Sequence, residues 1–369
     1  MLGSGGRSNE IRVAGTGALL KAWELSVGAS DGNDNELCVE NGGAVVVNGA
    51  KAFALGIGGI GGAGNRNRVV VGPDGVFSNA NAATAYIGGN YNNYGGGFEN
   101  EFIINGGKAW HGGEVVLGGS AYLDWGIGAD SNVLCVTAGG ELYCAGELNI
   151  GLCGASNRVE ILEGGKVTVG NSLNVGLQAN FRPWLVTAGK EGFGNVLRIV
   201  DGTLNLVRPG LPNVRGLVVT SGARLEIVGG RSRIRNDLGV FLFDKAVLRF
   251  EFDRVLPKHP LIEAKRHPAG FRCFRTTAGT TVQLELDVKE LAMAGGGRVT
   301  LIELIGIDEF GLEELEDLIT GATWENGIVG KLVIEKTSAE STGHNGDTIV
   351  DALLVCHVPN LSGTMILLR

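Results

Sequence analysis

The sequence predicts an all-β protein, a parallel β-solenoid whose coils are each about 25 residues long. Three observations predict this fold class. With 63 Gly and 8 Pro in 369 residues, turns are frequent and long helices are disfavoured. With 44% hydrophobic and 19% charged residues, the chain is too apolar for disorder. A pattern that begins with asparagine then recurs seven times, which is the signature of a repeat architecture.

Each copy of the repeat reads N-x-Φ-x-Φ, where Φ is an apolar residue, and a glycine follows about seven positions after the asparagine. A second signature, such as LNIG ending at Gly151, comes later in the copy. In the shortest copies it ends 19 residues after the asparagine, so longer copies carry insertions. The repeat asparagines are Asn9, Asn35, Asn67, Asn100, Asn132, Asn157 and Asn195. The second signature ends at Gly28, Gly58, Gly88, Gly128, Gly151 and Gly176.

The strand after each asparagine alternates between two faces. Successive strand residues point to opposite sides, so the Φ residues face inward and those between them face outward. A four-residue strand cannot bury its apolar face alone, but stacked on the same strand of the next copy it forms a parallel sheet around an apolar interior. The inward pairs are Ile11/Val13, Leu37/Val39, Val69/Val71, Phe102/Ile104, Leu134/Val136, Val159/Ile161 and Leu197/Ile199. The outward residues are Arg12, Cys38, Val70, Ile103, Cys135, Glu160 and Arg198.

The asparagines are predicted to form a ladder at one corner of the solenoid. A side-chain amide can hydrogen-bond to the identical group one coil above and below, and asparagine tolerates the left-handed backbone of a sharp corner. Glycine at the next corner meets the same requirement for positive φ. Crossovers between parallel strands are right-handed as a rule, so we expect a right-handed coil.

The copy at residues 132–157, NVLCVTAGGELYCAGELNIGLCGASN, resembles the glycine-rich repeat of type V secretion (autotransporter) passengers and of PEP-CTERM-associated surface proteins. The resemblance covers about residues 9–230. It implies an exported β-helix at the cell surface or outside the cell, with a structural or adhesive role. No export signal is present in this chain, so the route of secretion is left open.

The repeat pattern divides the chain into a solenoid at 1–250 and a region of degenerate coils and a cap at 251–369. A cap is expected because an uncovered end coil would be a template for edge-to-edge aggregation. Residues 308–318 are acidic and have helical periodicity. Residues 257–275 are basic and are expected to be a solvated loop. The alternatives for this segment are a docking contact for the acidic helix or for an acidic polymer.

Charge and composition exclude several kinds of partner. A net charge of −8 opposes binding to nucleic acid, and no apolar run is long enough to cross a bilayer. The six cysteines form no zinc-ligand spacing, and Cys135, Cys144 and Cys153 are expected on successive strands of one coil. His259 and His267 lack a third ligand nearby. Neither a metal nor a cofactor is therefore expected.

The function predicted from the sequence is that of a structural or adhesive module without catalytic residues, and a polysaccharide or cell-surface glycan is its candidate partner. Two insertions place aromatic residues beside asparagine amides, a combination that suits sugar rings. The alternative for these insertions is that they fold back and cover the flank of the solenoid. The candidate glycan-binding residues are Tyr91, Tyr94, Phe98, Phe181, Trp184 and Phe193. Two alternatives remain open. One is a polysaccharide lyase or glycoside hydrolase, whose carboxylates would converge from Asp31 and Asp34 or from Asp124 and Asp130. The other is self-assembly into a filament or surface layer.

Overall fold

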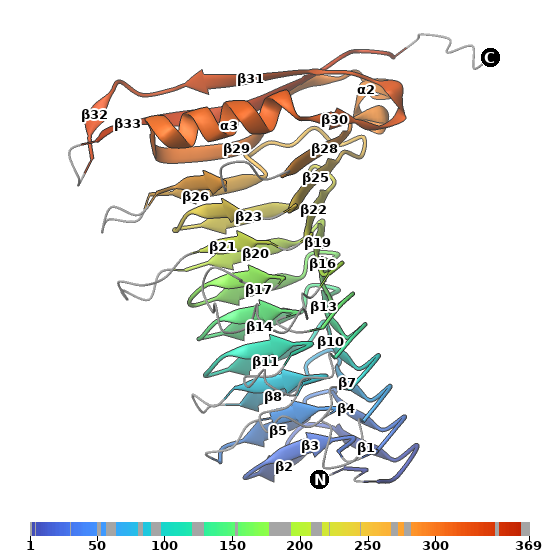
Figure 1. The fold of residues 1–369 in the computed structure, drawn as a ribbon. Helices are drawn as coiled ribbons and strands as arrows, with labels where there is room; N and C mark the ends of the chain where they lie inside the picture. The colour runs from blue at the N-terminus through green and yellow to red at the C-terminus, as the bar shows by residue number, and fades with distance from the viewer. Residues whose placement is uncertain are drawn as a thin grey trace.

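The computed structural model describes most of the chain as a stack of coils closed at its C-terminal end (Figure 1). Each coil contributes one strand to each of three parallel sheets, and this confirms the predicted β-solenoid. The described residues are 2–3, 5–29, 31–49, 53–56, 64–79, 84–89, 97–119, 129–151, 154–176, 193–207, 216–220, 222–243, 245–266, 272–276, 282–343 and 347–362.

The strands of the three sheets follow one another along the chain, so neighbours within a sheet are three strands apart up to β28 and β29, after which the C-terminal strands depart from this order. The first sheet contains β1 (Glu10–Ala14), β4 (Glu36–Glu40), β7 (Arg68–Val71), β10 (Glu101–Asn105), β13 (Val133–Thr137), β16 (Arg158–Leu162), β19 (Val196–Val200), β22 (Arg224–Val228), β25 (Val247–Glu251), β28 (Gln283–Asp287) and β30 (Thr323–Trp324). The second contains β2 (Leu19–Ala22), β5 (Ala44–Val47), β8 (Val76–Asn79), β11 (Lys108–His111), β14 (Glu141–Cys144), β17 (Lys166–Val169), β20 (Thr203–Leu206), β23 (Arg233–Asn236), β26 (Ile262–Lys265), β29 (Gly297–Asp308), β33 (Thr348–Val358) and β31 (Lys331–Lys336), with β32 (Ser341–Thr342) paired to β33. The third contains β3 (Leu25–Val27), β6 (Phe53–Leu55), β9 (Ala85–Ile87), β12 (Val115–Leu117), β15 (Leu148–Ile150), β18 (Leu173–Val175), β21 (Leu217–Val219), β24 (Val240–Leu242) and β27 (Phe274–Thr276).

The predicted inward residues of the first sheet fill the solenoid interior. Leu134 and Val136 of β13, for example, are fully buried, and the register places them beside the equivalent pairs of β10 and β16. Ile11 differs, because it is 36% exposed on β1, the outermost described strand of its sheet. The predicted outward residues are half-buried or exposed.

Two details of the corners differ from the sequence prediction. The second signature of the second and fourth copies ends at Gly56 and Gly118, which directly follow β6 and β12, and not at Gly58 and Gly128. The insertions therefore come after the third strand of a coil. The repeat asparagines also have no positive φ. The residue before each of them is the left-handed one, as at Ser131, where φ is 59°.

The second sheet carries several polar side chains into the apolar interior, and two of them are adjacent. Asn79 and His111 are neighbours in register on β8 and β11, and both are buried. The His111 ring lies about 6 Å between centroids from the rings of Phe53, Phe77 and Phe102. Neither ring nitrogen of His111 has a hydrogen-bond partner in the described part of the chain. Burial lowers the pKa of His111 from 6.5 to about 4, because the cation would lose its hydration.

This buried histidine predicts a loss of stability in mild acid. Below pH 6.5 the unfolded chain binds a proton at His111, whereas the folded chain does not until about pH 4. The free energy of unfolding should therefore fall by about 3 kcal/mol between these two pH values. His111→Leu should remove that decrease, measured as the urea midpoint against pH. His357→Gln, at an exposed histidine, is the control and should leave it in place. An equal decrease in His111→Leu would contradict the prediction.

The C-terminal region closes the stack (Figure 1). After β28 come α2 (Lys289–Met293) and the long β29, which pairs with β26 on one side and antiparallel with β33 on the other. The predicted acidic helix is α3 (Glu309–Thr320), and it buries Leu315 and Leu318 against the interior. A single 3₁₀ turn, η1 (Glu325–Gly327), precedes β31 among the described residues.

The basic segment at 257–275 is not a loop throughout, which corrects the sequence prediction. It contains β26 and begins β27, and Ile262 and Phe274 are fully buried, because the coil pattern continues through it with degenerate corners. Arg272 of this segment contacts the acidic helix region, where it forms ion pairs with Asp308 at 3.5 Å and Glu314 at 3.7 Å, and its guanidinium lies 5.0 Å from the centroid of the Phe310 ring. His259 is exposed, and His267 lies outside the described residues.

The cysteines that the structure describes are free thiols. Cys135 and Cys144 lie on successive strands, β13 and β14, whereas Cys153 lies outside the described residues. Burial raises the pKa of Cys144 to about 12, so this thiol stays protonated at neutral pH.

Candidate functional site

The repeat asparagines form a continuous hydrogen-bonded ladder from Asn9 to Asn195. At its centre, the backbone N–H and the side-chain amide of Asn100 both donate to Oδ1 of Asn132, each at 3.0 Å. Asn132 donates in the same way to Oδ1 of Asn157, again at 3.0 Å. From Asn35 onward these residues are fully buried. The ladder therefore satisfies a row of buried backbone donors that would otherwise lack an acceptor.

The second-signature glycines leave room for this ladder. A Cβ built on Gly118 would lie 2.1 Å from the amide nitrogen of Asn157, and one built on Gly151 would lie equally close to Asn195. Both glycines also have positive φ. The two signatures of the repeat are thus complementary, because the missing side chain at one corner provides the space that the asparagine fills.

Two of the six predicted glycan-binding aromatic residues, Phe98 and Phe193, lie in the described part of the chain. Tyr91, Tyr94, Phe181 and Trp184 lie outside the described residues. Phe98 and Phe193 each lie two positions before a ladder asparagine, but in different copies of the repeat. Phe98 is half-buried, whereas Phe193 is 54% exposed.

The second sheet presents a pair of aromatic rings on its outer face. Trp110 on β11 and Tyr143 on β14 are in register, with their ring centroids 6.1 Å apart and an angle of 5° between the ring planes. They are 39% and 38% exposed, so both rings are available to a ligand. Parallel aromatic rings on a rigid sheet suit the apolar faces of sugar rings, which stack on aromatic side chains.

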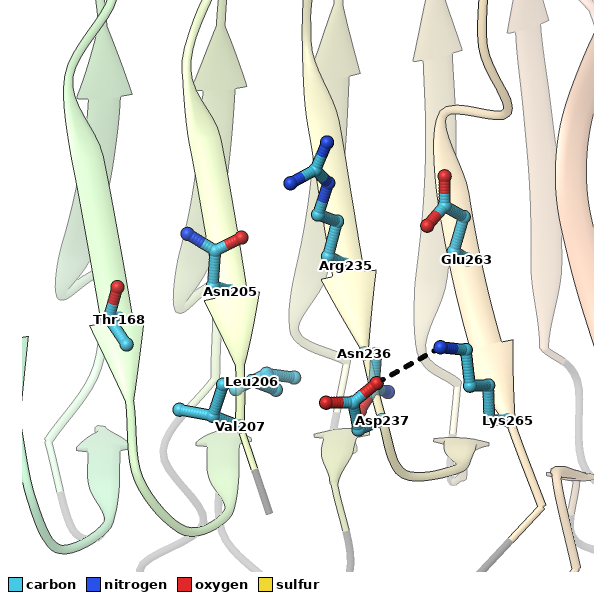
Figure 2. Close-up of a pocket in the computed structure, with 9 residues that line it drawn as sticks. All are labelled: Thr168, Asn205, Leu206, Val207, Arg235, Asn236, Asp237, Glu263 and Lys265. Atoms are coloured by element: carbon cyan, nitrogen blue, oxygen red, sulfur yellow. Dashed lines mark hydrogen bonds and ion pairs between the residues drawn. The ribbon is translucent and has the colours of Figure 1, made fainter.

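Two pockets that share Thr168 follow one another along the second sheet from this aromatic pair. The first part, with a volume of about 390 Å³, contains Trp110, Tyr143 and Thr168, and the second part, of about 300 Å³, continues along the next strands. We call the two parts the axial groove. Figure 2 shows the second part, where outward side chains of four successive strands lie in a row: Thr168, Asn205, Arg235 and Glu263.

The charges of the axial groove are paired, with one exception. Glu141 lies 3.3 Å from Lys108 and 3.7 Å from Lys166, and Asp237 lies 3.3 Å from Lys265. Glu263 forms an ion pair with Arg233. No ion pair or hydrogen bond joins the guanidinium of the exposed Arg235 to another described residue. The groove therefore offers one unpaired guanidinium among neutralised charges.

Sequence reasoning missed this row because it considered only the outward positions of the first strand. A signal was present in the glycine that directly precedes the second strand of several coils. Trp110, Tyr143, Thr168 and Asn205 each stand three positions after such a glycine, namely Gly107, Gly140, Gly165 and Gly202. Aligning the copies on this glycine, and then applying the alternation of a strand, places these side chains in one outward row.

Two of the carboxylates considered for catalysis, Asp34 and Asp130, accept hydrogen bonds from other groups. Asp34 accepts a hydrogen bond from Arg66 at 2.7 Å, and this contact lowers the pKa of Asp34. Asp130 accepts from the backbone N–H of Ala155 at 2.6 Å. Asp124 lies outside the described residues. The described residues contain no group of His, Cys, Asp and Glu side chains that could hold a metal ion, and none of their helices is long and apolar enough to cross a bilayer.

Comparison with known proteins identifies no family. No family model matches the chain, and no curated protein matches its sequence. Among solved structures, a hyper-glycosylated TibA fragment, with glycosylation catalysed by TibC, is 12% identical, and the match covers 75% of this chain and 98% of that chain. Its TM-score is 0.18, and at this value the likeness supports no inference about activity. The site must be interpreted from its own residues.

Proposed function

We propose that this protein is an extracellular or surface-exposed adhesive module that binds a polysaccharide along its second sheet and does not cleave it. The observation that carries the proposal is the parallel, exposed ring pair of Trp110 and Tyr143 at one end of the axial groove. The rings sit on strands held at both edges by neighbouring coils, so they are preorganised for binding. The resemblance of the repeat to exported passengers supports a location outside the cell.

Removal of one ring should weaken polysaccharide binding. Trp110→Ala is expected to raise the dissociation constant about fivefold or more, since stacking on an aromatic face contributes on the order of 1 kcal/mol or more. Affinity electrophoresis in gels that contain neutral or acidic polysaccharides measures this change. Because the side chain is on the outer face, the urea midpoint should stay unchanged.

Trp23→Ala is the matched control, since Trp23 is 67% exposed and lies outside the axial groove. It should leave retention unchanged. Equal retention of the wild type and Trp110→Ala on every polysaccharide that binds would overturn the proposal.

The absence of cleavage is tested on the same polysaccharides. The carboxylates of the axial groove each form an ion pair with a lysine or arginine, which does not favour the acid and base pair that glycoside hydrolysis needs. We therefore expect no new reducing ends and no unsaturated uronates after prolonged incubation, with and without calcium. Release of either product would replace the binding proposal with the lyase or hydrolase alternative.

A further inference from the structure

The unpaired arginine of the axial groove indicates the chemical class of the ligand. We propose that the bound polysaccharide is acidic and that it runs along the solenoid axis with a sugar carboxylate on Arg235. This inference rests on the proposed binding function and adds the ligand class to it.

The charge arrangement favours an anionic group at this position. The lining of the axial groove includes four cations and three carboxylates, although the whole chain carries a net charge of −8. Each carboxylate already has a cationic partner, and the cation without one is Arg235. A guanidinium presents a planar fork of donors that matches both oxygens of a carboxylate.

The neighbours of Arg235 suit a sugar chain. Thr168 and Asn205 precede it in the same row, one on each strand. Both are half-buried, and their side chains form no hydrogen bond to another described residue. A hydroxyl and an amide in these positions can bond to sugar hydroxyls. Val207 is 39% exposed and gives the groove an apolar wall beside them.

The spacing of the row also matches a chain that lies along the axis. Neighbouring strands are about 4.8 Å apart, which is close to the advance per sugar of an extended polysaccharide. Three strand spacings separate Tyr143 from Arg235, about 14 Å in all. A ligand that stacks on the aromatic pair would therefore place a sugar a few units along the chain beside Arg235.

The test compares polymers that differ only in charge. Polygalacturonate, alginate and hyaluronan are each used as the acid and as the methyl ester, with the wild type, Arg235→Gln and Trp110→Ala. We expect the wild type to bind at least one acid about tenfold more tightly than its ester. Arg235→Gln should reduce that ratio to about one while leaving the affinity for the ester unchanged. Arg231→Gln, at an exposed arginine outside the groove, is the control and should keep the wild-type ratio.

The outcomes separate this inference from the function on which it rests. If Arg235→Gln keeps the wild-type ratio of acid to ester affinity while Trp110→Ala weakens binding to both acid and ester, the proposal of an acidic ligand is wrong and the binding function stands. If Trp110→Ala changes neither affinity, the binding function fails as well. If the wild type binds acid and ester equally, or binds none of the six polymers, the acidic ligand is overturned.

Discussion

Asn132→Ala is expected to lower the free energy of unfolding by about 4 kcal/mol. Asn132 occupies the middle of the ladder, where its Oδ1 accepts from both the backbone and the side chain of Asn100. Alanine has no acceptor, so the buried N–H of Asn100 would lose its partner. The variant also removes the donor that reaches the carbonyl oxygen of Gly97 at 3.0 Å. Equilibrium unfolding in urea measures the loss.

Hydrogen exchange gives this prediction a local readout. The amide of Asn100 should exchange much faster in Asn132→Ala, whereas the amide of Val133, which donates to the carbonyl oxygen of Asn100, should stay protected. Asn205→Ala is the matched control, because Asn205 is an outward strand residue without a ladder hydrogen bond, and it should change stability by less than about 0.5 kcal/mol. Unchanged protection at Asn100 would show that the ladder does not hold this corner.

The end of the ladder shows why asparagine is needed where it occurs. Ala223 occupies the ladder position in the coil after Asn195, and Ala246 occupies it in the coil after that. Their backbone N–H groups donate instead to Thr220 and Phe243, three residues earlier, each at 3.0 Å. The buried backbone N–H at this corner thus has two possible acceptors, an asparagine side chain one coil away or a carbonyl oxygen in a local turn. In Asn132→Ala the backbone N–H of Asn100 would have neither acceptor, because the chain before Asn100 does not form that turn.

Much of this fold could be predicted from the sequence because the repeat imposes the same local requirement on every coil. Asparagine, inward apolar pairs and corner glycines recur together, and each has one physical role in a stacked coil. The left-handed residue directly before each repeat asparagine could not be predicted, because several residue types occupy this position, including Asp34, Arg66 and Glu99. Their φ is fixed by stacking between coils and not by their own preference.

The axial groove could be predicted only in part. Trp110 and Tyr143 are 33 residues apart in the sequence, and the insertion between β12 and β13 hides their common register unless the copies are aligned on the second-strand glycine. The ion pairs that leave Arg235 unpaired depend on which side chains meet across neighbouring strands, and they required the structure. The continuation of the coils through 257–275 was hidden because basic residues and prolines mask its buried positions.

Gly118→Ala is expected to lower the free energy of unfolding by about 5 kcal/mol, an effect at least as large as that of Asn132→Ala. The new methyl group would lie 2.1 Å from the amide nitrogen of Asn157, so Asn157 would have to move and lose its hydrogen bonds to Asn132. Positive φ at Gly118 adds a smaller strain. Gly139→Ala separates the two effects, because Gly139 has φ of 73° and no atom within 4 Å of the added methyl group. It should cost only about 1 kcal/mol.

A double-mutant cycle attributes the damage to the clash with Asn157. In Gly118→Ala/Asn157→Ala the methyl group has the space that the amide occupied, so the double variant should be more stable than the sum of the single effects predicts. The coupling expected is about 2–3 kcal/mol, as is found for residues in direct contact. Additive effects would mean that backbone strain alone explains the glycine. Coupling would establish that asparagine and glycine recur together in this repeat because each provides the space or the hydrogen bonds that the other requires.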